Sequence, residues 1–142
     1  MGIDAWHIMR KKISMGPVST AQDVAMKIIS SGLAAMPIVD EQQEVLGVVT
    51  EIGILGAIRQ GTDLAAITAA SIMVPAPLVA DINTPSDELV RMLLENCCSV
   101  ITVLNEKKYA GVISRHMLMD AFTSPRFSRY EEKERKGPFA CI

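Results

Sequence analysis

The chain repeats itself, and the repeat restricts its fold more than any other feature. Shifting the 142-residue sequence by 64 positions lays its first half on its second without a gap, so that Val45–Thr50 meets Tyr109–Ser114. Apolar positions and turn residues agree along the overlap, and the polar turns Glu41–Glu44 and Asn105–Lys108 coincide. Such a period indicates one supersecondary unit used twice. One unit alone has too little core to be stable, so the two units are expected to bury a common interior.

Each half reads as a β-α-β-β-α unit. The first half predicts an extended piece, a helix, two strands and a second helix, at Pro17–Thr20, Ala21–Ser31, Met36–Asp40, Val45–Thr50 and Glu51–Gln60. The second half predicts the same order, at Leu78–Ala80, from Thr84–Pro85 to about Asn96, at Val100–Leu104, Tyr109–Ser114 and Arg115–Phe122. Thr84 is expected to cap its helix, with Pro85 at the first helical position. The ungapped alignment places Thr20 on Thr84 and Val39 on Val103.

The flanking segments complete the predicted domain organisation. Asp4–Lys12 is predicted as a short helix outside the repeat, whose apolar stripe of Trp6 and Met9 makes packing or dimer contacts. Thr62–Ser71 is predicted as a short helical linker. We therefore expect an N-terminal helical extension at 1–13, the two units at 14–68 and 69–124, and a charged tail at 125–142. The mixed charges of the tail favour a solvated helix end or a disordered segment.

Composition excludes several classes of protein. A net charge of −2 gives no reason to expect a nucleic-acid or membrane partner. No apolar run reaches the roughly 20 residues of a spanning helix, and no signal peptide is visible. Three cysteines make a poor disulfide framework, which favours the reducing cytoplasm. The adjacent Cys97 and Cys98 are interpreted as buried small hydrophobes, and no matching Cys/His cluster predicts a metal site.

The sequence gives little support for an enzyme. It contains no Ser-His-Asp set, no pair of convergent carboxylates and no phosphate-binding glycine loop. With only two histidines, acid–base groups are scarce. We therefore expect no catalytic residues.

The ordered pattern has a known counterpart. Pro37–Asp40 precedes a turn, Gly47–Thr50 precedes a helix, and the second half repeats this order. The pattern resembles the cystathionine-β-synthase (CBS) domain, and the tandem resembles a CBS pair, or Bateman module, over about Ser14–Phe122. The resemblance implies an α+β fold with two units packed by pseudo-two-fold symmetry. It also implies a regulatory module, since many members bind AMP, ADP, ATP or S-adenosylmethionine in two clefts, act on enzymes, channels or transporters, and dimerise.

The family motif places candidate ligand contacts at both strand-to-helix corners. It runs Gly, two apolar residues, Ser or Thr, two variable residues and Asp, where the hydroxyl contacts phosphate or ribose and the Asp binds ribose. Thr50 and Ser114 match the hydroxyl position, while Gly53 and Met117 replace the Asp. The resemblance therefore predicts weakened ribose binding at both corners. The alternative for either hydroxyl is a plain helix N-cap.

Two further groups of residues are predicted at the clefts. Six match the family positions that sandwich an adenine ring, with core packing as the alternative: Met36, Pro37, Ile38, Val100, Ile101 and Thr102. Arg115 follows Ser114 and could pair with phosphate, or be an exposed arginine, whereas Glu51 follows Thr50. We therefore expect an anion to bind first at the Ser114/Arg115 corner. His116 is predicted as a surface histidine.

These observations lead to two functional hypotheses. The first is a stand-alone CBS-pair regulatory module that senses an adenine nucleotide or related small molecule and modulates a separate partner protein. The second is a ligand-free scaffold with degenerate nucleotide sites that serves dimerisation. Either would form a homodimer through two apolar helices, because these carry more apolar surface than a small module buries, at Ile54, Leu55, Ile58, Leu118, Met119 and Phe122.

Overall fold

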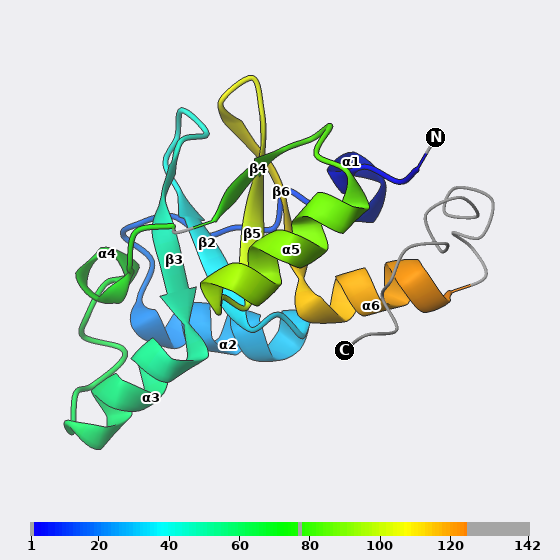
Figure 1. The fold of residues 1–142 in the computed structure, drawn as a ribbon. Coiled ribbons are helices and arrows are strands. Elements are labelled where there is room, and N and C mark those ends of the chain that lie inside the picture. The colour runs from blue at the N-terminus through cyan, green and yellow to red at the C-terminus, as the bar shows by residue number, and fades with distance from the viewer. Residues whose placement is uncertain (1, 77, 125–142) are drawn as a thin grey trace.

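The strands lie in two sheets with helices packed around them (Figure 1). The computed structural model describes residues 2–76 and 78–124, so the predicted charged tail lies outside the described residues. The strands are β1 (Arg10–Lys11), β2 (Ala35–Val39), β3 (Val45–Thr50), β4 (Val79–Asp81), β5 (Val100–Asn105) and β6 (Lys108–Ser114). The helices are α1 (Ala5–Ile8), α2 (Ala21–Ser31), α3 (Glu51–Arg59), α4 (Ala69–Ile72), α5 (Ser86–Asn96) and α6 (Arg115–Thr123).

The two sheets carry the two repeats. One has the order β1-β6-β5-β4, with β4 and β5 parallel and the other pairs antiparallel, and the second is the hairpin β2-β3. Isolated bridges Met15–Ile38 and Val48–Val74 flank the hairpin at the places where β4 and β1 flank β5 and β6. The predicted α+β fold of two β-α-β-β-α units is therefore confirmed.

The register of the repeat differs from the ungapped alignment. Ala35 pairs with Thr50, and Val100 pairs with Ser114. Thr50 therefore corresponds to Ser114, 64 positions on, but Ala35 corresponds to Val100, 65 positions on. Helix α2 (Ala21–Ser31) is likewise 65 positions from α5 (Ser86–Asn96). The uniform shift of 64 is thus wrong by one residue across the first helix and first strand of the hairpin.

Two differences in segment length cancel, which is why the ungapped alignment does not reveal this one-residue shift. The segment between Val74 and Ala80 is one residue longer than its counterpart between Arg10 and Met15, since the bridges at these residues are equivalent. The turn between β5 and β6 is in turn one residue shorter than the turn between β2 and β3.

The helix starts follow local capping, with one correction. Thr20, Thr50 and Ser114 each accept a hydrogen bond from the backbone N–H three residues later, as expected for N-caps. Thr84 does not cap α5. Its hydroxyl accepts from the Asp81 N–H over 3.1 Å, and Pro85 occupies the N-cap position.

The two segments that lead into the units are exchanged, so that each packs on the other unit. The predicted helix Asp4–Lys12 is wrong beyond Ile8, because the chain leaves α1 and pairs as β1 with β6. The bridge of Asp4 to Pro85 has its counterpart in the bridge between Thr68 and Thr20. The segment that precedes each unit therefore packs on the other unit, and α1 and α4 are equivalent. The interpretation of Asp4–Lys12 as lying outside the repeat is corrected, and of the predicted linker Thr62–Ser71 only the end is helical.

Two glycines permit this exchange. A Cβ on Gly111 would lie 2.7 Å from the Arg10 carbonyl oxygen, and a Cβ on Gly47 would lie 2.4 Å from the Val74 carbonyl oxygen. Real Cβ atoms essentially never approach so closely. The absence of a side chain at each position is what lets the other unit's leading segment approach the strand.

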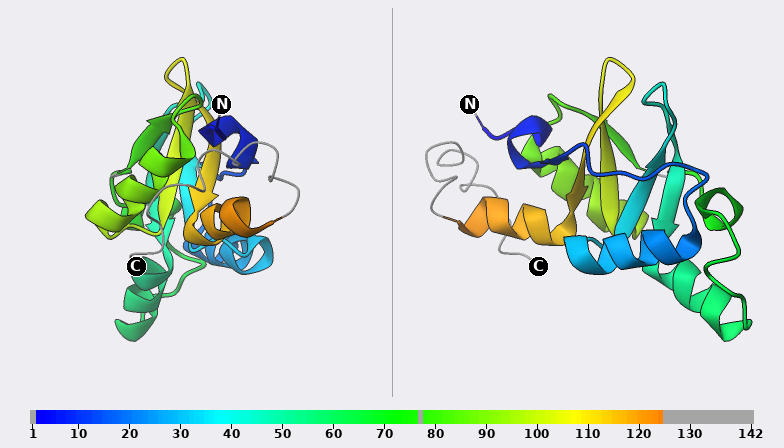
Figure 2. Two further views of the ribbon diagram at one scale, coloured as in Figure 1. Left: turned by 45° about the vertical axis from the view of Figure 1, so that its right-hand side comes forward. Right: turned by 180° about the vertical axis from the view of Figure 1, so that it is seen from behind.

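The core consists of two clusters of buried residues, and one of them includes residues of both hairpins. One cluster joins α1, α5 and α6 to β5 and β6, and the other joins α2 and α3 to β2 and β3 and includes Val100 and Val112 from the second unit. Every residue of β2 is buried. Figure 2 shows from behind how the N-terminal segment crosses the sheets, and how the C-terminal end of α2 meets the start of α6. That junction is the site described next.

Candidate functional site

A cleft lies where α2 ends and α6 begins. It has a volume of about 320 Å³, and we call it the Ser114 cleft. Its lining residues come from the leading segment, the end of α2 and the start of α6: Ile8, Met9, Arg10, Ser31, Gly32, Leu33, Ser114, His116 and Met117. Three segments that are distant in sequence therefore meet at one predicted corner.

Ser114 is both a helix cap and a wall of this cleft. Its Oγ accepts a hydrogen bond from the Met117 N–H over 3.2 Å, and the residue is only 6% exposed. The hydroxyl proton remains able to donate to a ligand oxygen. The start of α6 adds the partial positive charge of a helix N-terminus, which favours an anion.

Arg10 supplies the permanent charge of the cleft. Its guanidinium donates a hydrogen bond of 2.6 Å to the Ser31 carbonyl oxygen at the end of α2. This carbonyl belongs to the last turn of the helix, whose oxygens lack intrahelical partners and carry partial negative charge. The sequence analysis missed Arg10 because it placed this residue in a helix. The signal that could have found it is the basic run Arg10–Lys12. If this run is a strand, its consecutive side chains point to opposite faces, and Arg10 points away from Lys11.

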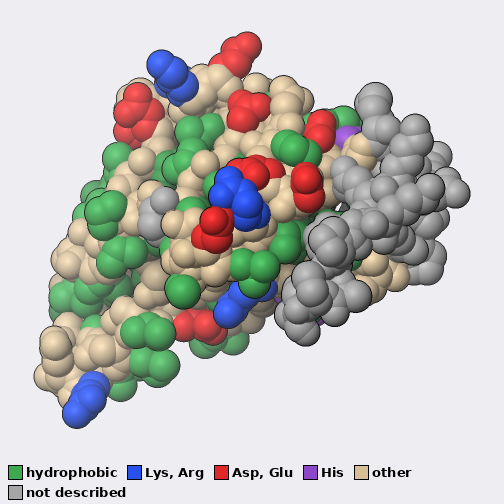
Figure 3. All heavy atoms as spheres, viewed as in Figure 1, with side chains coloured by type: hydrophobic (Ala, Val, Ile, Leu, Met, Phe, Trp, Pro, Cys, Tyr) green, Lys and Arg blue, Asp and Glu red, His purple; other side chains and the backbone are tan. Residues whose placement is uncertain are grey.

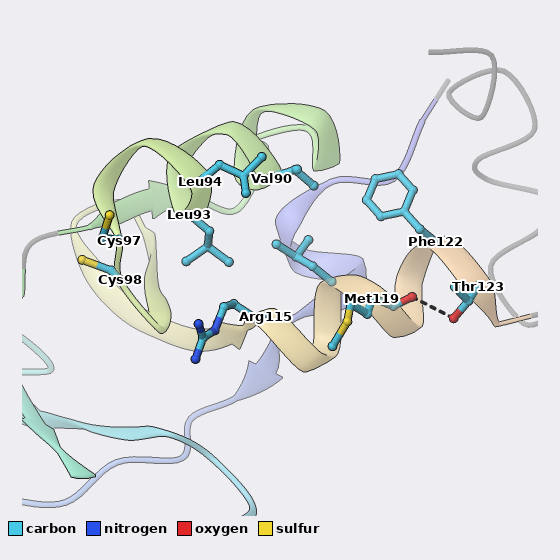
Figure 4. A pocket seen from close by; sticks show the side chains of 10 residues that line it. Val90, Leu93, Leu94, Cys97, Cys98, Arg115, Met119, Phe122 and Thr123 are labelled. Carbon is cyan, nitrogen blue, oxygen red and sulfur yellow. Dashed lines mark hydrogen bonds between the residues drawn. The ribbon is translucent and has the colours of Figure 1, made fainter. Parts of the chain in front are cut away.

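The structure does not bring Arg115 into the Ser114 cleft. Arg115 lines a separate groove of about 930 Å³ between α5 and α6, which we call the α5–α6 groove. Figure 4 shows it there below Cys97 and Cys98, with Phe122 toward the far end of α6. Arg115 and Ser114 thus line different cavities, and their joint binding of one anion stays a prediction. The Ser114 cleft does hold another arginine, Arg10, from elsewhere in the chain.

The corner at Thr50 lacks these charges. The Thr50 Oγ1 accepts from the Gly53 N–H over 2.9 Å, so this hydroxyl is also a cap. By the internal symmetry, Val74 stands at the position of Arg10 and Ile52 at that of His116. The expectation that the second corner suits an anion better than the first therefore rests on different residues from those the sequence suggested.

The candidate adenine-contacting residues are buried. All six lie in β2 and β5, at Met36, Pro37, Ile38, Val100, Ile101 and Thr102. None of them lines the Ser114 cleft or the α5–α6 groove. Thr102 donates through Oγ1 to the Leu78 carbonyl oxygen over 3.0 Å, which satisfies its hydroxyl in the core. Contact of these six residues with an adenine ring stays a prediction.

The adjacent cysteines differ from the expectation. Cys97, which ends α5 with a left-handed φ of 53°, is exposed, and Cys98 is half-buried. Both line the α5–α6 groove. Within residues 2–76 and 78–124, no three His, Cys, Asp or Glu side chains come together in a way that could hold a metal ion. In the same residues, no helix is long and apolar enough to cross a bilayer.

The model of the CBS domain family matches this chain twice, over residues 4–60 and 69–124. The first match begins in the leading segment, in agreement with the exchange of α1 described above. No curated protein has a significantly similar sequence.

Solved structures share the fold at low sequence identity. A putative acetoin utilization protein (AcuB) from Vibrio cholerae is 16% identical, covers 97% of this chain and 100% of its own, and superposes with a TM-score of 0.79. CBSX2 from Arabidopsis thaliana, in complex with AMP, is 19% identical with a TM-score of 0.74, covering 88% of this chain and 99% of its own. The CBS domain of a bacterial CNNM/CorC family Mg²⁺ transporter, in complex with ATP, is 20% identical with a TM-score of 0.69, covering 83% and 85%.

Proposed function

Since this chain belongs to the CBS domain family, we propose that it is a regulatory module that binds an adenine nucleotide or a related small anion in the Ser114 cleft and modulates a partner protein. Two of the solved structures that share its fold contain AMP or ATP. The proposal is of regulation without catalysis, and of a cytoplasmic location in keeping with the free Cys97 and Cys98.

The observation that carries the proposal is the meeting of Arg10 and Ser114 in one cleft. A guanidinium and a helix N-terminus both attract phosphate, and hydrogen bonds to charged groups contribute about 1.5–3 kcal/mol each. The Arg10 guanidinium donates to the Ser31 carbonyl oxygen. An anion in the cleft would compete for the same donors.

Ribose selectivity is expected to be poor in this cleft. The position that binds ribose in the family is Met117, a half-buried apolar side chain that lines the cleft. We therefore propose that the ligand is recognised by its anionic group, with AMP, ADP, ATP and S-adenosylmethionine as the first compounds to compare. S-adenosylmethionine tests whether the phosphate is needed for binding, because it contains adenosine but no phosphate group.

The test is a thermal-shift and calorimetric screen of the wild-type chain. A ligand that binds the folded state at 100 times its Kd stabilises it by about 2.7 kcal/mol, so the melting temperature rises. Saturable binding of a phosphate-bearing nucleotide supports the proposal. No shift with any of the four compounds at millimolar concentration would favour the alternative of a ligand-free scaffold.

A specific observation favours the dimerisation part of either hypothesis. Ile52, Leu55 and Ile58 on α3, and Met119 on α6, are between 52% and 82% exposed. Figure 3 shows hydrophobic side chains over α3, while the face of α5 carries mixed charges. Ile54 and Leu118, which the sequence analysis assigned to the same surface, are instead buried in the core of their own chain. We propose that the remaining apolar residues of α3 and α6 form a homodimer interface.

A further inference from the structure

A third cavity borders the leading segment, as the Ser114 cleft does. It has a volume of about 630 Å³, and we call it the lysine cavity. Its lining residues come from the leading segment, the segment after β4 and the β5–β6 hairpin: Trp6, Met9, Lys11, Lys12, Gln43, Ile82, Asn83, Asn105, Lys108, Tyr109 and Ala110. The volume falls within the range of natural small-molecule sites.

The strand geometry explains why the basic run serves two cavities. Arg10 and Lys11 are consecutive in β1, and consecutive side chains of a strand point to opposite faces. Arg10 therefore lines the Ser114 cleft, whereas Lys11 lines the lysine cavity. Lys12 lies beyond the end of β1, where its φ of 49° breaks the alternation, and it lines the lysine cavity too. The wall between them is the leading segment, since Met9 borders both cavities.

The charged side chains that line the lysine cavity are all positive. Three of its lining residues are lysines and none is Asp or Glu. Like charges gathered in one cavity repel each other and are relieved by a bound anion. The lysine cavity also has side-chain amides at Asn83, Asn105 and Gln43, which can donate to phosphate oxygens.

Backbone strain gathers at the same place. Lys12 and Gln43 have left-handed φ values of 49° and 66°, which non-glycine residues rarely adopt. Hydrogen bonds hold both conformations: the Lys12 N–H donates to Ala110, and the Gln43 carbonyl accepts from Tyr109. Residues held in such conformations by their surroundings cluster at ligand sites.

We propose that the lysine cavity binds a ligand with two or more linked phosphoryl groups, independently of the Ser114 cleft. A single charge would pair with only one lysine, whereas a phosphate chain can span several. The shared chemistry is the phosphate chain, whether it belongs to a free polyphosphate or to a nucleoside triphosphate. The indole of Trp6, 46% exposed on the lining, is positioned to meet an attached base in the second case.

Trp6 also provides the measurement, because it is the only tryptophan of the chain. Inorganic tripolyphosphate, titrated at constant ionic strength, is expected to change the Trp6 fluorescence in a saturable way. The double variant Lys11→Gln/Lys12→Gln, and separately Lys108→Gln, should each raise the Kd about tenfold or more. The control Lys27→Gln, on the exposed face of α2, should leave the Kd unchanged. Arg10→Gln distinguishes the two sites, because Arg10 lines the Ser114 cleft and not the lysine cavity.

Each outcome decides between explanations. A fluorescence change without saturation, or an equal loss in Lys27→Gln, would overturn the proposal in favour of general charge attraction. Loss in Arg10→Gln but not in the lysine variants would place the probe in the Ser114 cleft. A parallel titration with ATP tests whether a base adds affinity beyond tripolyphosphate. Thermal unfolding of every variant shows whether it is folded, and Lys108→Gln, at the edge of the hairpin, keeps the test valid if the double variant is not.

Discussion

The guanidinium of Arg10 donates a hydrogen bond of 2.6 Å to the carbonyl oxygen of Ser31. This contact joins the leading segment to the last turn of α2, and both residues line the Ser114 cleft. The Arg10 guanidinium thus pairs with the C-terminal end of α2, and Arg10 lines the same cleft as Ser114 at the start of α6. Because the bond is exposed, an entering anion can replace it at little cost in stability.

The first prediction compares the two arginines of this region. Arg10→Gln is expected to weaken binding of the best nucleotide by about 10- to 150-fold, the range for a hydrogen bond to a charged group. Arg115→Gln is the matched control, since Arg115 lines the α5–α6 groove and should leave the affinity unchanged. Calorimetric titration of both variants measures the effect. A loss confined to Arg115→Gln would reverse our assignment of the cleft.

The second prediction restores the missing carboxylate. Met117→Asp places a carboxylate on the wall of the Ser114 cleft and in the first turn of α6, where negative charge is favourable. Affinity for AMP should rise by about 10- to 150-fold, and the preference for AMP over inorganic phosphate should rise with it. Gly53→Asp is the comparison at the other corner, where a Cβ lies only 3.1 Å from the Thr50 Oγ1. We expect it to gain less. Equal weak binding by Met117→Asp and wild type would show that ribose does not reach this position.

The third prediction concerns the exchanged leading segments. Gly47→Ala and Gly111→Ala should each lower the free energy of unfolding by about 1–3 kcal/mol, because the added methyl meets a backbone carbonyl oxygen, and at Gly111 the Met9 side chain as well. Gly56→Ala is the control: its Cβ would meet nothing within 4 Å, and alanine in a helix interior should stabilise by about 0.5–1 kcal/mol. Urea unfolding of the three variants checks the order. Gly111→Ala should also weaken ligand binding, since it displaces Arg10, whereas Gly47→Ala should not.

The fourth prediction is a dependence of stability on pH. Tyr109 is buried, its hydroxyl donates to the Ile13 carbonyl oxygen over 2.5 Å, and burial raises the pKa of this phenol above its ordinary value. The folded state therefore keeps a proton that the unfolded state loses above about pH 10. Stability should fall as the pH rises from about 10 toward the raised pKa.

The variant Tyr109→Phe isolates this effect. It should lose about 1–3 kcal/mol near neutral pH, because the Ile13 carbonyl oxygen loses its donor. Above pH 10 the gap between the two proteins should narrow. A constant gap between pH 8 and pH 11.5 in urea unfolding would mean that the pKa of Tyr109 is the same in both states.

The fifth prediction tests the proposed homodimer. Light scattering at micromolar concentration should give twice the chain mass for the wild type, and Ile58→Glu on α3 should give the monomer mass. Ile29→Glu on α2 is the matched control, since Ile29 is 80% exposed and lies outside the proposed interface. A monomeric wild type, or dissociation by Ile29→Glu alone, would refute the interface.

The sequence by itself determined which segments form helices and strands, and where several of them begin and end. The three hydroxyl caps, the glycine that ends α2 and the apolar segments of the strands act within a few residues of their own position, so they can be read from the chain in order. The tandem fold follows from the same local signals, because they occur twice in one order. This is why Thr50 and Ser114 were located correctly at the two corners.

The register of the repeat required the tertiary structure. Every residue of β2 is buried, so the strand shows no alternation between faces from which its pairing could be read. The second unit has one more residue before its first strand and one fewer in its hairpin turn, and the two differences cancel. The ungapped alignment therefore matches the structure at both ends of the repeat and is wrong by one residue between them.

Only the tertiary structure decided which charged groups surround the candidate site. Arg115 is next to Ser114 in the sequence, but neighbouring residues of a helix point in different directions, and Arg115 lines the α5–α6 groove. Arg10 comes from the opposite end of the chain and lines the same cleft as Ser114 because Gly111 leaves room for β1. The approach of β1 depends on contacts between residues far apart in sequence, and no local pattern around Ser114 encodes it.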